Sequence, residues 1–213
     1  MKRAGRSQSP YIVYLGILMS RLTCVIVASV PCLLFPQQAL ATSMLHQNID
    51  SLTQSSDAVV RGKVRATQSR WSADHKRIIT DVTIDVAEFF KGGGSSTLVV
   101  QQPGGEIDGI GQKVSGLASF SEGEEVVLFL EHLETNKYRV AGMAQGKYRV
   151  ERSSDKKAVF VVPESTEEAL VIDPQTHAPV ESDRQPMELA SLKAKIRAAA
   201  KSHPGDRGAR KEP

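Results

Sequence analysis

The chain has 213 residues and carries 27 lysines and arginines against 24 aspartates and glutamates. Four of the cations, Lys2, Arg3, Arg6 and Arg21, lie in the first 41 residues, which contain no acidic side chain. Without that segment the charge balance is −1, whereas the whole chain has a formal net charge of +3. This composition excludes a strongly basic domain of the kind that binds nucleic acids, so we expect no nucleic-acid partner.

Residues 1–41 predict an export signal. An apolar run at 22–35 follows Arg21, and the segment ends in Ala39-Leu40-Ala41. A basic start, an apolar centre of about 7–15 residues and small residues at the exit are the parts of a secretory signal. A membrane span would need about 20 apolar residues, more than this run contains. We therefore predict cleavage after Ala41, a periplasmic or secreted location, and no membrane span after cleavage.

The translation start has two candidates, because starting at Met19 instead of Met1 would give a shorter signal of the same kind. Either start leaves a processed chain that begins at Thr42 and lacks both cysteines, Cys24 and Cys32. We therefore expect no disulfide, no thiol nucleophile and no cysteine metal ligand in the processed protein. Its 172 residues (213 less 41) suffice to bury the core of one domain without covalent cross-links.

Short strands dominate the prediction from Ala58 onward. Apolar residues alternate with polar ones between Ile78 and Val86, which is typical of a half-buried strand. The glycine-rich stretch at 91–95 favours a turn, because glycine accepts positive φ without steric cost. Short strands separated by such turns predict a mainly β fold, either a small barrel or a sandwich. The expected strands lie at 58–71, 78–86, 97–102, around Val114, and at 125–130, 138–143, 147–151 and 158–162.

Helical spacing occurs near both ends of the β-rich part. Met44, Leu45, Ile49 and Leu52 predict a short helix before Asp57. Pro186 suits the first turn of a second helix, whose apolar stripe is formed by Leu189, Leu192, Ile196 and Ala199. The predicted organisation is a signal peptide at 1–41, a β domain with an amino-terminal helix at 42–165, a linker at 166–185, a carboxy-terminal amphipathic helix at 186–201 and a disordered basic tail at 202–213.

Four segments resemble a group of uncharacterised secreted bacterial proteins: SDAVVRGKV (56–64), TIDVAEFFKGG (83–93), GEEVVLFL (123–130) and GKYRV (146–150). The opening part also resembles the OB-type barrel of netrin-like modules and tissue inhibitors of metalloproteinases. This resemblance implies a small OB-like β-barrel. In those inhibitors an amino-terminal cysteine binds the protease metal through its amine and carbonyl, whereas Thr42 stands at the predicted terminus here.

No residue pattern predicts a cofactor, a metal site or a catalytic residue. The glycine-rich stretch at 104–111 lacks the following helix and the Lys-Ser/Thr pair of a phosphate-binding loop, so it is interpreted as a long flexible loop between strands. The histidines of the processed chain lie more than five residues from one another, which excludes the i, i+4 pair of a helical zinc site. These histidines are His46, His75, His132, His177 and His203.

The connections at 68–77 and 103–113 are the best candidates for partner contacts, because binding residues tend to lie on loops held by a rigid scaffold. We predict an exported, non-enzymatic module that binds another extracytoplasmic protein, with inhibitor-like binding as one form of this function. Two alternatives stay open: an extracytoplasmic hydrolase without a recognised motif, and a structural envelope protein whose basic tail contacts anionic surfaces. The candidate contact residues are Arg70, Trp71, His75, Glu106, Ile107, Asp108 and Ile110.

Overall fold

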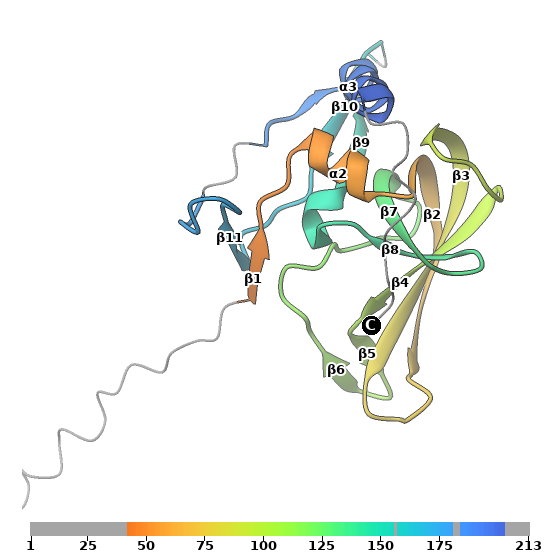
Figure 1. Cartoon of the computed structure of the whole chain (residues 1–213). Helices are drawn as coiled ribbons and strands as arrows, with labels where there is room; N and C mark the ends of the chain where they lie inside the picture. Colours follow the sequence, from red (N-terminus) through yellow and green to blue (C-terminus); the bar gives the residue numbers. More distant parts are fainter. Residues whose placement is uncertain (1–41, 156, 181–183, 203–213) are drawn as a thin grey trace, which may run out of the picture. The chain divides into compact units, whose positions relative to one another are not determined.

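The computed structural model describes residues 42–155, 157–180 and 184–202 (Figure 1). The predicted signal peptide, both candidate starts and the tail beyond Ser202 lie outside these residues. The prediction of a mainly β fold with a helix near the carboxy terminus is confirmed. Within the described ranges, no helix combines the length and the apolar character that crossing a membrane requires.

Five strands form a ring at the centre of the fold. They are β2 (Ala58–Trp71), β3 (Ile78–Lys91), β4 (Thr97–Pro103), β7 (Glu125–Glu134) and β8 (Lys137–Val140). The strands pair in the order β7-β2-β3-β4-β8. The ring closes because β8 pairs with β4 in parallel and with β7 in antiparallel orientation. The prediction of a strand at 58–71 matches β2 in full.

The sheet continues beyond the ring on the far side of β7. β9 (Lys147–Arg152) pairs with the first half of β7, and β10 (Val159–Pro163) pairs with β9. β12 (Met187–Glu188) completes this edge by pairing with β10. One side of β7 therefore pairs with β9 and then with β8, while its other side pairs with β2.

Two hydrophobic cores lie on the two faces of the ring strands. Val60, Val82 and Leu128 are fully buried members of the inner core, whereas Val59 and Phe129 belong to the outer one. Successive side chains of a strand point to opposite faces, so a strand buried on both sides reads as a continuous apolar run. This explains the unbroken runs at 58–60 and 126–130.

Two helices cover the outer core. α2 (Ile49–Ser55) starts at Asn48, whose side chain accepts a hydrogen bond from the Ser51 amide. α3 (Leu189–Ser202) buries Leu192, Ile196 and Ala199, the stripe that the sequence predicts. The two helices contact each other on the same side of the sheet (Figure 1).

Some predicted boundaries are wrong because tertiary pairing overrides local spacing. Met44 and Leu45 belong to strand β1 (Thr42–Leu45) and not to a helix, because β1 pairs in parallel with β11 (Ala169–Ile172). β11 lies within the segment that the sequence analysis interprets as a linker. The second helix starts at Leu189 instead of 186, because the two preceding residues form β12.

The middle of the chain shows two further differences. The expected strand around Val114 is absent from the described structure, and the nearest strand is β6 (Ile110–Gln112), which pairs with β5 (Gly105–Ile107). The strand predicted at 138–143 ends at Val140, where the chain enters a short 3₁₀ helix, η2 (Met143–Gly146). Gly142 has φ 63°, a left-handed conformation that ends the strand.

Candidate functional site

The first part of the predicted 68–77 connection, residues 68–71, is strand and belongs to the β2–β3 hairpin. Pairing continues to Trp71 and Ile78, so only residues 72–77 form the turn. The Asp74 carboxylate accepts hydrogen bonds from the Ser72 hydroxyl, at 2.6 Å, and from the Lys76 amide. The Ser72 bond is the main reason why the pKa of Asp74 lies below its usual value. The end of the ribbon is therefore an ordered turn.

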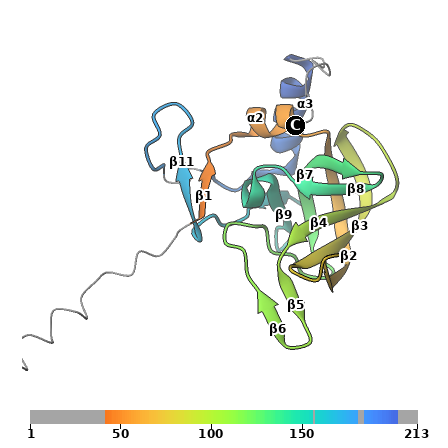
Figure 2. The same ribbon diagram turned by 60° about the horizontal axis from the view of Figure 1, so that its bottom comes forward.

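The stretch interpreted as a flexible loop is a second hairpin, so that interpretation is wrong. Ile107 of β5 lies directly opposite Ile110 of β6. Asp108 and Gly109 connect the two strands with φ values of 52° and 75°. Positive φ at both central residues is the geometry of a tight turn that matches strand twist, and Asp-Gly is among its preferred sequences. Figure 2 shows this hairpin projecting beyond the end of β4.

Hydrogen bonds attach the base of the second hairpin to the β2–β3 ribbon. The Gly104 amide donates to the Ile78 carbonyl at 2.8 Å, and the Thr80 hydroxyl donates to the Gly104 carbonyl at 2.6 Å. The Ile78 amide donates to the Gln112 side chain at 2.9 Å. Gly105 has φ 130°, and a Cβ there would collide with the hydroxyl oxygens of Ser69 and Thr80. The close approach of the two hairpins therefore requires glycine.

The two predicted contact segments are thus joined at the base of the second hairpin, and we call their residues together the hairpin-tip surface. Ile110 is 54% exposed, and His75, Glu106 and Asp108 are also exposed. Its members are Arg70, Trp71, His75, Glu106, Ile107, Asp108 and Ile110. The surface therefore presents a large apolar side chain next to carboxylates, on two hairpins tied to a rigid ring.

Arg70 is set apart from the other members. Its Nε donates to Asp81 at 2.7 Å, and Asp81 also accepts from Gln101 at 2.8 Å. The hydrogen bond to Asp81 and the charge of that carboxylate raise the pKa of Arg70. Side chains alternate along a strand, so Arg70 faces away from the ribbon face of Ser69 on which β5 lies. Its guanidinium therefore links β2 to β3 through Nε, while its side chain remains 43% exposed.

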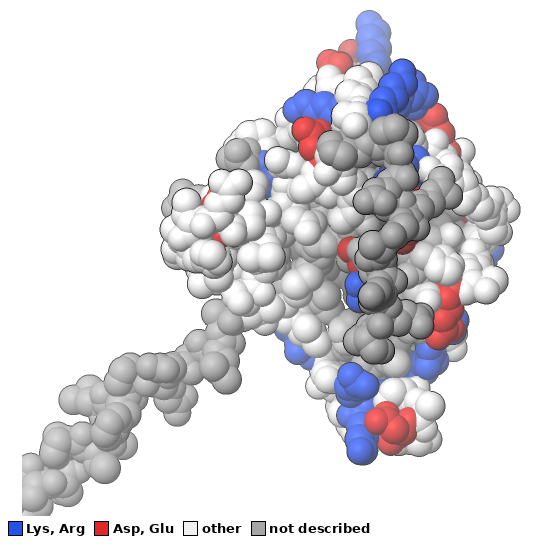
Figure 3. All heavy atoms as spheres, in the orientation of Figure 1, with Lys and Arg blue, Asp and Glu red and all other residues white. Residues whose placement is uncertain are grey.

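On the face in Figure 3, outside the grey atoms, basic and acidic side chains alternate, and both kinds occur at the hairpin end. The side chains of Arg61 and Arg152 both pair with Glu125, at 2.5 and 2.6 Å. Electrostatic recognition of a polyanion is therefore not supported by this surface.

An ion cluster around a buried lysine lies at the start of β9, and the sequence predicts no such cluster. Lys147 is 1% exposed, and its ammonium pairs with Glu124 at 2.9 Å and with Glu164 at 3.2 Å. It also donates to the Ser119 carbonyl and lies 4.9 Å from the centre of the Phe120 ring. Lys147 opens β9 in an ordinary alternating pattern, so no sequence signal marks it as buried.

The cluster fixes the segment that precedes β7. Burial alone would raise the pKa of Glu164, but the hydrogen bond from the Ser119 hydroxyl and the charge of Lys147 outweigh it, and the pKa is lowered. The Ser119 hydroxyl donates to Glu164 at 2.5 Å. Gly123 has φ 83° and allows the sharp turn into β7. Residues 119–124 are therefore held toward β9 and β10.

A shallow cavity of about 270 Å³ opens between β4, β8 and η2. Glu131 and Arg139 are the only ionisable side chains in its described lining, and they pair with each other at 2.6 Å. Both ionisable groups of the described lining are therefore engaged with each other.

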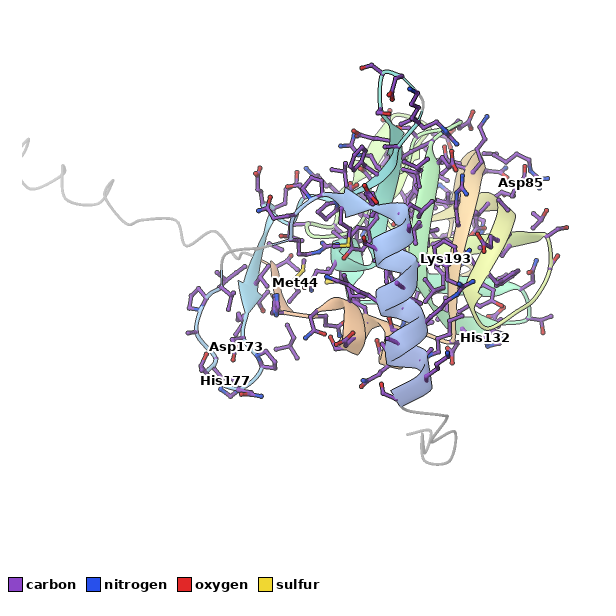
Figure 4. All side chains as sticks on the ribbon, turned by 90° about the horizontal axis from the view of Figure 1, so that it is seen from above. Met44, Asp85, His132, Asp173, His177 and Lys193 are labelled. Atoms are coloured by element: carbon purple, nitrogen blue, oxygen red, sulfur yellow. The ribbon has the colours of Figure 1, made fainter. Side chains whose placement is uncertain are left out.

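The described histidines are dispersed. Figure 4 shows His177 beside Asp173 in the loop after β11, well separated from His132 and Asp85. In the parts of the chain that the structure describes, no group of three or more histidine, cysteine, aspartate or glutamate residues is arranged to hold a metal ion. Comparison with known proteins adds no assignment: no family model matches the chain, and no curated protein matches its sequence significantly.

Proposed function

We propose that this chain is an exported module that binds another extracytoplasmic protein through the hairpin-tip surface. The observation that carries the proposal is that the two predicted contact segments, 68–77 and 103–113, are joined through hydrogen bonds between the second segment and the start of β3. The donors are Gly104, Thr80 and Ile78. A partner would meet the exposed Ile110 side chain on a fixed support, so little conformational entropy would be lost on binding. Exposed apolar side chains on rigid supports are suited to protein contacts.

The ring supports the resemblance to OB-type domains. An OB-type barrel has five strands in a Greek-key order, and this ring has five strands with one parallel pair, between β4 and β8. We propose on this basis that the ring is of the OB type. Inhibition of a metalloprotease through an amino-terminal cysteine is not part of the proposal, because the predicted processed chain begins with Thr42.

Export is part of the same proposal. The basic start, apolar run and small-residue exit of residues 1–41 support it, as does the absence of cysteine after Cys32. Thr42, the first residue after the predicted cut, is also the first residue of β1. Amino-terminal sequencing of the protein from culture medium and from a periplasmic extract tests export, with Thr42 as the expected first residue; an uncut protein in the cytoplasm would contradict it.

The binding experiment is affinity capture with the purified protein as bait against envelope and supernatant proteins of the producing cells, followed by mass spectrometry. The test variant is Ile107→Ser with Ile110→Ser. The control is Leu45→Ser with Leu170→Ser, since these side chains are 57% and 43% exposed but lie on β1 and β11. We expect one saturable partner, retained by the control and lost by the test variant. Retention by both variants, or no partner at all, would overturn the proposal.

A further inference from the structure

Strand β2 has one edge that changes character along its length. From Ala58 to Lys63 it pairs with β7, and the Val64 amide still donates to the Glu124 carbonyl at 2.8 Å. Beyond that point, within the described residues, the segment 66–71 pairs with β3 alone. The second edge of this segment, which we call the open edge, therefore has no strand of the described chain beside it.

Main-chain groups point outward along the open edge. The Ser72 amide donates to the Arg77 carbonyl, across the ribbon, so the even-numbered residues of this stretch face β3. The amides and carbonyls of Thr67, Ser69 and Trp71 consequently point away from β3. The Thr67 amide donates to the Glu122 carboxylate at 3.1 Å. That side chain occupies the place where the carbonyl of an adjacent strand would lie.

The open edge results from fixed structure. If residues 119–124 extended β7 backward along β2, they would pair with the open edge. Gly123 turns the chain instead, and Lys147 holds the Ser119 carbonyl and Glu124 toward β9. Natural proteins protect strand edges with bulges, lysines or prolines. The irregularities in the β2–β3 pairing all precede Ala66, so the open edge is regular and carries Glu122 as its cover.

We propose that an extended segment of the partner protein adds to the open edge as a further strand. This strand would displace the Glu122 side chain and lie on the same edge of β2 as β7, beyond the point where β7 begins. The inference rests on the proposed function, since it names how the partner at the hairpin-tip surface binds. The edge presents the neutral polar side chains of Thr67, Gln68 and Ser69, and Arg70 is paired with Asp81. It therefore fits an extended segment that is uncharged at its central positions and free of proline there.

The probe is a peptide selected from a phage-displayed library of random dodecapeptides against the purified protein. Amide hydrogen exchange and fluorescence anisotropy are measured with the wild type, with Ser69→Pro and with Ser69→Ala. Proline removes the outward N–H, and proline is tolerated at an edge position whose N–H faces solvent. Alanine keeps the N–H and is the matched control. We expect protection of the Ser69 and Trp71 amides, a loss of affinity of about tenfold or more with proline, and little change with alanine.

A second measurement covers the case in which Ser69→Pro fails to fold. Peptides that are N-methylated at odd positions are compared with peptides methylated at even positions, using the wild-type protein. Because alternate amides of a strand point to opposite sides, only one of the two series should abolish binding. Equal effects of the two series would mean that the peptide does not bind as a strand.

The remaining outcomes separate this inference from the proposed function. No selected peptide, or peptides that bind without protecting Ser69 and Trp71, would overturn strand addition; loss of the captured partner in the Ile107→Ser, Ile110→Ser variant would still support the hairpin-tip surface. Protection of the edge by concentration-dependent self-association would show that a second copy is the occupant, contrary to the inference. A peptide on the edge with no captured protein would leave strand addition standing and overturn the proposed function.

Discussion

The two halves of β2 belong to one strand but have different neighbours. Residues 58–64 pair with β3 and β7 and separate the two cores, with Val59 in one and Val60 in the other. Among the residues that the structure describes, 66–71 pair with β3 alone, and they are half-buried or exposed. The side chains follow this change, from Ala-Val-Val to Thr-Gln-Ser. One strand therefore serves as scaffold at one end and as a surface for contacts at the other.

The largest effect is expected from removing the Lys147 ammonium, which holds Ser119 and Glu124 near the start of β9. Lys147→Met leaves the partly buried Glu124 and Glu164 without their counter-charge, and breaking a buried ion pair typically costs about 3–5 kcal/mol of unfolding free energy. Urea denaturation followed by circular dichroism measures it. Lys63→Met is the control, because Lys63 is exposed and lies on the same ring, and it should change stability by less than about 0.5 kcal/mol. Equal losses in the two variants would mean that the buried cluster does not hold this segment.

Core packing gives the next effect and contrasts the ends of the molecule directly. Leu128, opposite Val60, is fully buried, so Leu128→Ala should cost about 2–5 kcal/mol through lost burial and a cavity. Ile110→Ala at the hairpin tip should cost less than about 1 kcal/mol, because that side chain is already 54% exposed. Midpoints of urea denaturation test both. A comparable loss at Ile110 would show that the tip is part of the core and not a surface.

A smaller and pH-dependent effect is expected at Glu164. Its pKa is lowered in the folded protein, so the folded state is stabilised while the carboxylate is ionised. This contribution is present above the unfolded pKa of about 4.3 and is lost as the pH falls through the lower folded value. Stability measured from pH 6 to pH 2 should therefore fall less steeply with Glu164→Gln than with the wild type. Parallel profiles would contradict the assignment.

Much of the fold follows from local patterns. The alternation between Ile78 and Val86 predicts β3, the run at 126–130 lies within β7, and the stripe of Leu192, Ile196 and Ala199 predicts α3. In each case the apolar residues recur over enough of the element to bury one of its faces, so the element that the spacing predicts is the one that packs in the structure.

The missed features depend on distant partners. β1 and β11 have four residues each and are strands because they pair with each other across most of the chain. Lys147 is buried because Glu124 and Glu164 come from two other segments, and nothing in its own neighbourhood indicates this. The second hairpin was open to prediction, since Asp108-Gly109 between Ile107 and Ile110 is a recognised turn signal. Its attachment to Ile78 and Thr80 was not, because that contact joins separate parts of the chain.

The smallest effect sharpens the contrast between the halves of β2 most directly. Glu122→Ala removes the side chain that accepts from the Thr67 amide, at an exposed site where stability should change by less than about 0.5 kcal/mol. The Thr67 amide should exchange faster with deuterium, since its only described acceptor is lost, whereas Val60, which lies between β3 and β7, should exchange at an unchanged rate. Amide-resolved exchange measures both. Unchanged exchange at Thr67 would mean that the edge is covered by something other than Glu122, and strand addition would lose the site that it needs.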